Sequence, residues 1–270
     1  MRNSRERSPA IPCNAEAAAA LGPLVNSRHM SRNVGCSQEV LPNMNGDVVR
    51  RNFDKAASKY DTIKIQIVPK YREAERLLQG YVAFPKTRCV RILELGTGTG
   101  KWASGILCDF PKAHYHGVDF SEAMLQVASS RLRTFARRPV ILQKLDLNEE
   151  TPTGQFDLIY SAFTIHHVQD KRKLFRSLRD LLKPRGLFLY MDITIASNSA
   201  LESRFLESWK RFMQKSPWPN HKIKRIIDDH FENDIPETVE TQLKYLGEAG
   251  YTHYDVVWRY EKFAAFHAQK

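Results

Sequence analysis

Apolar residues alternate between two patterns along the chain from residue 90 onward. Short apolar runs typical of buried strands occupy five segments, at 90–95, 114–119, 140–145, 157–163 and 186–193. Apolar positions at helical spacing fill three segments between them, at 100–109, 121–135 and 170–182. Strands separated by helices in this way pair in parallel through right-handed crossovers. The pattern therefore predicts a doubly wound α/β sheet.

Helical spacing also predicts two helices ahead of the first strand. In the first helix, the residues that share one apolar face are Val49, Phe53, Ala57 and Tyr60. A second helical segment runs over about 69–79. We expect residues 46–85 to form a helical cap on the sheet.

The pattern changes again after the fifth strand. One amphipathic helix interrupts the alternation, with an apolar face formed by Leu201, Phe205, Trp209 and Met213. It predicts a lid insertion at 196–235, which a further helix follows at 236–249. The chain ends in two β-rich runs, at 252–260 and 262–269. Their connection is so short that they must pair antiparallel.

The composition fits one folded domain behind a polar N-terminal segment. The chain has 270 residues, of which 42% are hydrophobic, enough for one well-buried core or two small ones. Residues 1–45 mix Ser, Asn, Pro, Ala and Arg without helical or strand periodicity, so we expect a disordered extension. The remaining chain, 46–270, is expected to be a single domain.

The net charge is positive but spread along the chain. Lysine and arginine total 41 against 30 aspartate and glutamate, a formal charge of +11, which suggests nucleic acid or a membrane surface as a partner. Residues 1–51 hold seven basic and four acidic residues, so +8 of the charge is distributed over the rest. A diffuse excess of this kind attracts polyanions weakly and defines no groove.

Cysteine spacing and hydropathy argue against several other classes of protein. The four cysteines form no CxxC pair, so neither a disulfide framework nor a metal site is predicted. No apolar run is long enough for a membrane span or for the core of a secretory signal. We therefore expect a cytoplasmic protein, and the arginine-containing, acid-poor start of the chain leaves mitochondrial import open.

A glycine-rich turn, ELGTGTGK at 94–101, follows the first predicted strand and precedes a helix. Such a turn lets a ligand approach the main chain and the unpaired N–H groups of the helix. A phosphate-binding P-loop would require glycine at Leu95 and Ser or Thr at Trp102, so that interpretation fails. A dinucleotide fingerprint would require glycine or alanine at Lys101, which makes it a strained match.

The turn resembles the E-x-G-x-G-x-G motif of class I S-adenosylmethionine-dependent methyltransferases. Four further motifs follow in that family's order, at 117–121 (GVDFS), 145–147 (LDL), 156–159 (FDLI) and 182–187 (LKPRGL). The resemblance covers about 49–270. It implies a Rossmann-like, mostly parallel seven-stranded sheet with a C-terminal antiparallel strand pair and a helical lid. It also implies S-adenosyl-L-methionine as the cofactor.

The resemblance further implies which residues bind the cofactor. The matching positions are Tyr60, Glu94, Gly96, Thr97, Gly98, Asp119, Phe120, Met124, Asp146, Leu147, Ser161 and Phe163. Of these, Asp119 would accept hydrogen bonds from the ribose hydroxyls, Asp146 would meet the adenine amino group, and Glu94 the methionine end. For Tyr60 and Met124, simple packing of an amphipathic helix is an open alternative.

Two adjacent histidines stand just beyond the fourth predicted strand, where doubly wound sheets bind ligands. A general base helps when the methyl acceptor carries a proton, and the pKa of histidine suits that task. We take His166 as the candidate catalytic base and Asp192, at the end of the fifth strand, as a second candidate. A purely structural role for His166 and His167 stays open. Candidate aromatic residues for an acceptor pocket are Trp209, Trp218 and Tyr245.

The sequence therefore predicts methyl transfer, by in-line displacement, to a small-molecule acceptor. An RNA- or protein-directed methyltransferase is the first alternative, suggested by the basic stretches at 131–138 and 222–225. Neither stretch carries the interleaved aromatics of a nucleic-acid platform. The fourth strand also lacks the Asn/Asp-Pro-Pro-aromatic sequence of enzymes that methylate exocyclic amines of nucleic acids. A catalytically silent binding protein is the second alternative, and the acceptor, the methylated atom and the oligomeric state stay open.

Overall fold

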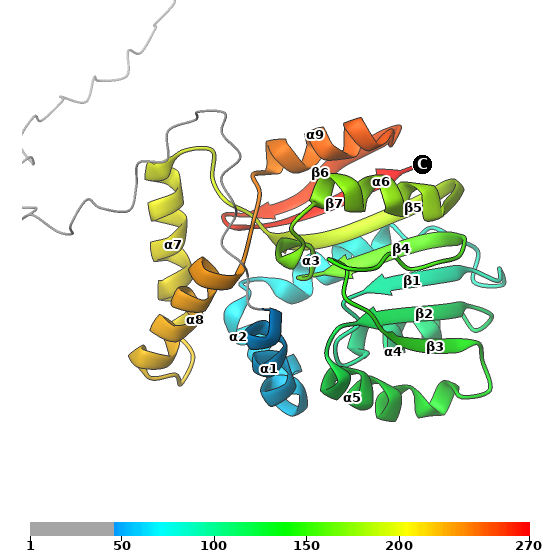
Figure 1. The fold of residues 1–270 in the computed structure, drawn as a ribbon, viewed down its shortest axis with the longest axis horizontal. Coiled ribbons are helices and arrows are strands. Elements are labelled where there is room, and N and C mark those ends of the chain that lie inside the picture. Colours follow the sequence, from blue (N-terminus) through cyan, green and yellow to red (C-terminus); the bar gives the residue numbers. More distant parts are fainter. Residues whose placement is uncertain (1–45) are drawn as a thin grey trace, which may run out of the picture. The chain divides into compact units, whose positions relative to one another are not determined.

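The predicted alternation of strands and helices produces one seven-stranded sheet in the part of the chain that the computed structural model describes, residues 46–270. The extension predicted at 1–45 lies outside the described residues. The strands are β1 (Arg91–Leu95), β2 (His114–Asp119), β3 (Val140–Lys144), β4 (Phe156–Ala162), β5 (Leu182–Ile193), β6 (His253–Tyr260) and β7 (Phe263–Gln269). Their order is β3-β2-β1-β4-β5-β7-β6 (Figure 1).

The pairing of the strands confirms the predicted fold class. Strands β1 to β5 pair in parallel, whereas β7 is antiparallel to both β5 and β6. The sheet is thus mostly parallel and Rossmann-like, with the antiparallel pair at its C-terminal edge.

Helices cover both faces of this sheet. The N-terminal helices are α1 (Gly46–Ala56), α2 (Tyr60–Ile67) and α3 (Tyr71–Gly80). Between strands lie α4 (Lys101–Asp109), α5 (Glu122–Leu132) and α6 (Lys171–Leu181), and the C-terminal part adds α7 (Ser199–Met213), α8 (Asn220–Asn233) and α9 (Val239–Ala249). Helices α1, α2, α7 and α8 gather on the side of the sheet toward which the parallel strands point (Figure 1).

Alternate strand positions supply one apolar core on each face of the sheet. Strand β4 is buried along its whole length, with Leu158 and Tyr160 in one core and Ile159 in the other. The first core packs against α3, α4 and α7, and the second against α6 and α9. The ring of Tyr160 stacks on Trp102 of α4, with 3.8 Å between ring centroids. Burial on both faces explains why the parallel strands appear in the sequence as continuous apolar runs.

The structure departs from the predicted elements in the cap and in the lid. The helix predicted around 49–60 is divided into α1 and α2 by a 3-10 turn at Ala57–Lys59. The lid contains a second helix, α8, that is missing from the predicted elements because the polar residues His230 and Asn233 occupy its inward face and interrupt its apolar spacing. Its inward positions include the buried Ile223 and His230.

The described residues contain neither a helix long and apolar enough to cross a membrane nor a disulfide bond. Cys89 and Cys108 are free and exposed. The other two cysteines, Cys13 and Cys36, lie outside the described residues.

A buried carboxylate joins three segments at the amino end of the sheet. Asp157, near the start of β4, is 1% exposed. It accepts hydrogen bonds from the Arg91 backbone N–H at 2.8 Å, from the Lys183 ammonium at 2.8 Å and from Arg88 at 2.6 Å. Although burial alone would raise the pKa of Asp157, these donors and their positive charges hold it below its ordinary value.

We expect Asp157→Ala to lower the free energy of unfolding at neutral pH by about 1.5–3 kcal/mol, because two cations lose the acceptor of their charged hydrogen bonds. The deficit should shrink as the pH falls below the ordinary aspartate range, since acid then protonates Asp157 in the unsubstituted protein as well. Urea unfolding at neutral and at acidic pH measures both effects. The control is Asp180→Ala, which removes an exposed acid, and equal losses in the two variants would refute the anchoring role.

Candidate functional site

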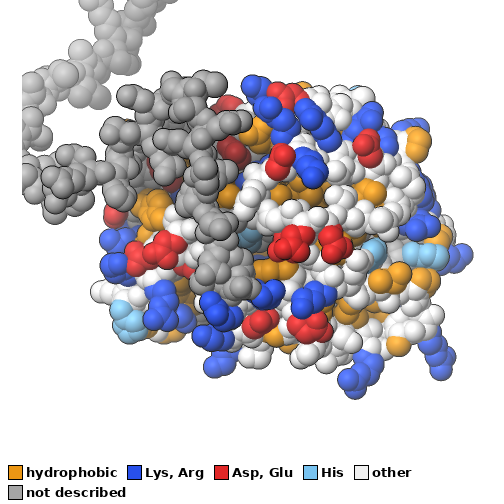
Figure 2. Space-filling view, viewed as in Figure 1, with side chains coloured by type: hydrophobic (Ala, Val, Ile, Leu, Met, Phe, Trp, Pro, Cys, Tyr) orange, Lys and Arg blue, Asp and Glu red, His pale blue; other side chains and the backbone are white. Residues whose placement is uncertain are grey.

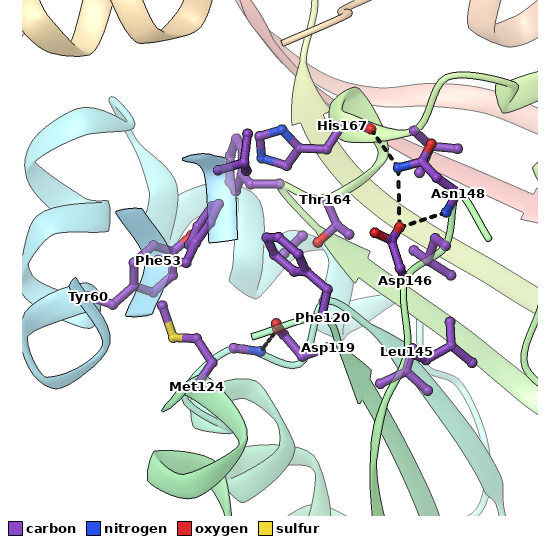
Figure 3. Close-up of a pocket in the computed structure, with 18 of the residues that line it drawn as sticks. Phe53, Tyr60, Asp119, Phe120, Met124, Leu145, Asp146, Asn148, Thr164 and His167 are labelled. Carbon is purple, nitrogen blue, oxygen red and sulfur yellow. Dashed lines mark hydrogen bonds between the residues drawn. The ribbon is translucent and has the colours of Figure 1, made fainter. Parts of the chain in front are cut away.

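The carboxyl ends of β1, β2 and β4 border a cavity, which we call the first cavity. The glycine turn, the loops after β2, β3 and β4, and the cap helices all contribute to it (Figure 3). The lining residues labelled in that figure are Phe53, Tyr60, Asp119, Phe120, Met124, Leu145, Asp146, Asn148, Thr164 and His167. The cavity thus lies where ligands bind in doubly wound sheets.

The glycine turn exposes main-chain atoms to this cavity. Gly96 and Gly98 both line it, and both have a positive φ, of 64° and 52°. A Cβ atom on Gly96 would lie 1.9 Å from Oγ1 of Thr164, so no larger residue fits there. A ligand in the cavity can therefore contact the backbone directly.

Glu94 lies at the base of the turn and is 3% exposed. Its carboxylate accepts hydrogen bonds from the hydroxyl groups of Thr97 and Tyr115. Burial raises the pKa of Glu94 to about 8, and these hydrogen bonds offset only part of that effect. Lys64 of α2 lines the same small recess as Glu94 and Thr97, and burial lowers the pKa of its amine. An acid and a base whose charged forms are both disfavoured thus face one recess beside the glycine turn.

Asp119, the last residue of β2, is oriented by backbone hydrogen bonds. The Gly98 N–H donates to Oδ2 at 2.8 Å, and the Ser121 N–H donates to Oδ1 at 2.9 Å. Burial raises the pKa of Asp119 to about 6 in spite of these two bonds. The carboxylate therefore has a fixed orientation and keeps further lone pairs for a ligand.

A hydrogen-bonded loop on another wall of the cavity contains Asp146 and Asn148 (Figure 3). Oδ1 of Asp146 accepts from the Asn148 backbone N–H at 2.9 Å and from its side-chain amide at 3.3 Å. The same amide donates to the backbone carbonyl of His167 at 3.2 Å. The loop after β3 is thereby joined to the loop after β4.

The cap helices close the first cavity and are bound to the segments beneath it. The ring of Phe53 contacts that of Phe120 edge-on, with 5.7 Å between centroids. Asp61 of α2 accepts hydrogen bonds from the Thr99 hydroxyl and from the Arg131 guanidinium, both at 2.7 Å. These contacts hold the cap over the glycine turn.

A second cavity adjoins the first. The residues that line both are Val49, Phe53, Tyr60, Lys64, Phe163 and His167. The lid contributes Trp209 from α7 and Ile226 and His230 from α8. Apolar walls and a cluster of acids and histidines therefore meet in one space next to the first cavity.

His166 is held by two carboxylates at the wall of the second cavity. Its backbone N–H donates to Oδ2 of Asp192 at 2.8 Å, and its Nδ1 contacts Oδ1 of the same carboxylate. Its Nε2 lies 3.7 Å from Oδ1 of Asp234. Burial alone would lower the pKa of His166, but the charges of Asp192 and Asp234 raise it above the ordinary histidine value.

In contrast to His166, the neighbouring His167 and Asp234 both have lowered pKa values. Burial, together with the charge of His166, lowers the pKa of His167 to about 4. Burial alone would raise the pKa of Asp234, but three adjacent histidines bring it down to about 2. At neutral pH the cluster therefore contains a neutral His167 beside an ionised Asp234.

The structure brings most of the predicted site residues together. Those that line the first cavity are Tyr60, Gly96, Gly98, Asp119, Phe120, Met124, Asp146, Leu147 and Phe163. Glu94 and Thr97 line the adjoining recess, and His166 lines the second cavity. Ser161 is not brought there, because its side chain is fully buried and faces the carbonyl of Leu95 at 3.4 Å.

Of the three candidate aromatic residues, Trp209 alone lines the second cavity. Trp218 packs at the margin of the first core, with the Lys222 ammonium over its ring. Tyr245 lies on α9, where it packs against the other core, and its ring contacts Phe175. Trp218 and Tyr245 therefore have a packing role, the alternative to lining an acceptor pocket, and a role in acceptor binding stays a prediction for Trp209.

Several lining residues are missing from the predicted set. Phe53 and Lys64 lie on cap helices, and the apolar face of the first helix is the signal that would point to Phe53. Asn148 and Thr164 each follow a predicted site residue within two positions. Asp234 has no local signal, because it lies at the end of the unpredicted helix α8.

Known proteins share the central part of this fold and its motifs. A family model described as a methyltransferase domain matches residues 93–188. That segment begins in β1, ends in β5 and contains the glycine turn, Asp119 and Asp146.

Curated relatives and solved structures extend the likeness over most of the chain. The malonyl-[acyl-carrier protein] O-methyltransferase 2 of Ilyobacter polytropus is 29% identical over 189 residues, which cover 68% of this chain and 69% of the relative. The carboxy-S-adenosyl-L-methionine synthase of Sulfurimonas denitrificans is 25% identical over 228 residues, covering 82% and 96%. Phosphoethanolamine N-methyltransferase 2 of Haemonchus contortus, in complex with phosphomonomethylethanolamine and S-adenosylhomocysteine, superposes with a TM-score of 0.59 at 18% identity, covering 82% of this chain and 60% of that one.

At 18% identity the solved structure supports the fold alone. The family model and the curated relatives add likeness in sequence over the segments that form the first cavity. Together, the matched domain, the curated relatives and the shared fold support a class I S-adenosylmethionine-dependent methyltransferase with S-adenosylmethionine as its cofactor.

Proposed function

We propose that this methyltransferase acts on a small-molecule acceptor bound in the second cavity. The observation that carries the proposal is the junction of the two cavities, which Tyr60, Phe163 and His167 line from both sides. An acceptor in the second cavity would meet the methyl donor through this junction. Lid residues such as Trp209 and Ile226 line the second cavity. A cavity enclosed in this way suits a small molecule better than a polymer.

The chemistry of the first cavity and its recess fits S-adenosylmethionine. The bare backbone at Gly96 admits close approach of the cofactor. Asp119 is placed to accept hydrogen bonds from the ribose hydroxyls, and Asp146 from the adenine amino group. In the recess, Glu94 and Lys64 offer opposite charges for the ammonium and the carboxylate of the methionine end.

When bound, S-adenosylmethionine supplies an electrophilic methyl group and a neutral thioether leaving group. The chain's own task is then to align the acceptor and to exclude water. Phe53 and Tyr60 cover the junction from the cap. Phe163 has a φ of 59°, a strained value for a residue other than glycine, and it leads the chain into the 3-10 turn Ile165–His167. That turn places the two histidines at the second cavity.

His166 is the candidate for the group that takes the acceptor's proton. Asp192 contacts its backbone N–H and its Nδ1, which leaves Nε2 as the atom available at the cavity. As the acceptor's nucleophilic atom bonds to the methyl carbon, its proton would pass to Nε2. The carboxylate of Asp192 would stabilise the resulting imidazolium, which makes it a positioning residue rather than the base.

The surface gives little support to an RNA-directed alternative. On the face shown in Figure 2, lysine and arginine side chains are interspersed with acidic ones rather than gathered in one groove. In the two basic stretches, Arg131 pairs with Asp61 at 2.7 Å and Lys224 pairs with Asp228 at 2.6 Å. Part of each stretch is therefore neutralised within the protein.

The proposal is tested by incubating the purified protein with methyl-labelled S-adenosylmethionine and, separately, a metabolite extract, total RNA and a protein fraction. We expect label in the metabolite fraction alone. The inactive control is Gly96→Val, whose side chain would collide with Thr164 in the cofactor site. Label found only in RNA or only in protein would overturn the proposal.

We expect His166→Ala to lower kcat by about 10²- to 10⁴-fold at saturating acceptor, because the proton loses its acceptor. The Kd for S-adenosylmethionine should stay within about twofold, since His166 lines the second cavity and not the first. Single-turnover kinetics with the acceptor found above, together with calorimetric titration of the cofactor, measure the two quantities. An exposed histidine on β6, His253, supplies the control His253→Ala. An unchanged kcat in His166→Ala would remove this residue from the chemistry.

Cofactor affinity should rise with pH between about 6 and 8. The pKa of Glu94 is about 8 and that of Asp119 about 6, so Glu94 holds a proton over most of this range and Asp119 holds one partly at its lower end. The cofactor's ammonium and hydroxyl groups must replace these protons. Release of one proton corresponds to about tenfold in affinity per pH unit. Calorimetric titration across this range measures the slope, and Glu94→Gln should flatten it. A slope of zero in the unsubstituted protein would contradict the proposed contacts of these two acids.

A further inference from the structure

A cluster of possible metal ligands lies where the turn after β4 meets the end of helix α8 in the lid. One ligand atom from each of His166, His167 and Asp234 lies within 4.8 Å of the others. Oδ1 of Asp234 is 3.7 Å from Nε2 of His166 and 3.4 Å from Nδ1 of His167. A tetrahedral ion with bonds of about 2.0–2.1 Å holds its ligand atoms about 3.3–3.4 Å apart. The two distances from Asp234 to the histidine nitrogens thus already approach the spacing of a metal site.

One atom of the cluster is buried without a partner. Nδ1 of His167 has no hydrogen-bond partner among the described residues. It faces Oδ1 of Asp234, yet the contact does not have hydrogen-bond geometry. If Nδ1 carries a lone pair, two lone pairs face each other across this gap. A cation between them would satisfy both atoms at once.

The surrounding groups orient the ligands as the outer shell of a metal site does. Asp192 binds Nδ1 of His166, which fixes the ring and directs the lone pair of Nε2 toward Asp234. His230 contacts Oδ2 of Asp234 at 2.7 Å and leaves Oδ1 for the cluster. The Ile235 N–H donates to the His166 carbonyl at 2.8 Å and holds the end of α8 against the turn that carries both histidines.

We propose that Nε2 of His166, Nδ1 of His167 and Oδ1 of Asp234 form a binding site for a divalent transition-metal ion, represented by zinc. Two imidazoles and one carboxylate are a ligand set that zinc and ferrous iron accept. All three residues line the second cavity, so the remaining coordination position faces the acceptor space. The sequence contains no spacing motif that predicts this metal site, because Asp234 is far from the two histidines along the chain.

Metal occupancy has a consequence that rests on the proposed function. The lone pair of His166 Nε2 binds either a proton or a metal ion. An occupied site therefore blocks proton removal by His166, and zinc should inhibit methyl transfer without weakening cofactor binding. The metal would then act as a reversible inhibitor from within the acceptor cavity.

The site is tested on the full-length protein, freed of metal with a chelator and titrated with zinc against a chromophoric competitor. We expect about one zinc per chain with a Kd in the micromolar range or tighter. His167→Gln and Asp234→Asn should each weaken binding more than tenfold. Asp192→Asn keeps all three ligands and should weaken it by about 10- to 100-fold, as loss of an outer-shell partner does. His221→Ala, which removes an exposed histidine from α8, should change nothing.

Cobalt(II) supplies a second measurement that does not depend on affinity alone. The unsubstituted protein should show the visible d–d absorption of a protein-bound ion. Asp234→Asn should lose this absorption while still binding S-adenosylmethionine, because Asp234 lines the second cavity and not the first. No zinc binding in the unsubstituted protein, or equal binding in His167→Gln and His221→Ala, would overturn the site. Because these measurements need no methyl acceptor, their failure is separate from failure of the proposed function. Zinc that binds at this site yet leaves turnover unchanged would overturn the inhibition.

Discussion

Parallel pairing of β1 with both β2 and β4 is the constraint on which the site depends. In the register of these strands Glu94 is opposite Gly117 on one side and Tyr160 on the other, so the three strands end together. A Cβ atom on Gly117 would lie 2.7 Å from the Tyr115 hydroxyl and 2.8 Å from Oγ1 of Thr97. These are the two groups that bond to Glu94. The glycine on β2 therefore makes room for the hydrogen bonds that hold the buried acid of β1.

Much of the fold follows from periodicity, because the central strands β1, β4 and β5 are buried on both faces and most helices bury one face. The five parallel strands and the helices between them lie within a few residues of their predicted positions, and the motif order places Asp119 and Asp146 at the first cavity. Periodicity fails where polar residues occupy an inward face. Helix α8 buries His230 and Asn233, so its apolar pattern is interrupted at the positions that line the second cavity.

Side-chain direction within a strand limits the prediction in a different way. Ser161 occupies a motif position, but its side chain is fully buried within the strand and does not line the first cavity. Phe163 and Thr164 follow the end of β4 and do line this cavity. Contacts between distant segments, such as those of His166 with Asp192 and Asp234, form only when the chain folds. The spacing of residues along the chain therefore cannot predict them.

The direction of the pKa shift separates the structural carboxylate from the proposed functional ones. The pKa of Asp157 is lowered by its cations, so its ionised form stabilises the fold. Glu94 and Asp119 have raised pKa values because burial costs free energy that their hydrogen bonds do not recover. Retaining such acids lowers stability, which is what a site awaiting complementary charge from a ligand requires.

The two cavities divide the chemistry between different parts of the chain. The groups that line the first cavity come chiefly from strand ends, whose positions the sheet fixes, whereas those that line the second cavity come in part from the lid. The hydrogen bond from Ile235 to the His166 carbonyl joins the lid to the turn after β4. A shift of α8 would therefore change the shape of the second cavity and the surroundings of His166 together. Under the proposed function, acceptor specificity would therefore depend on how the lid packs, while the sheet would specify the methyl donor.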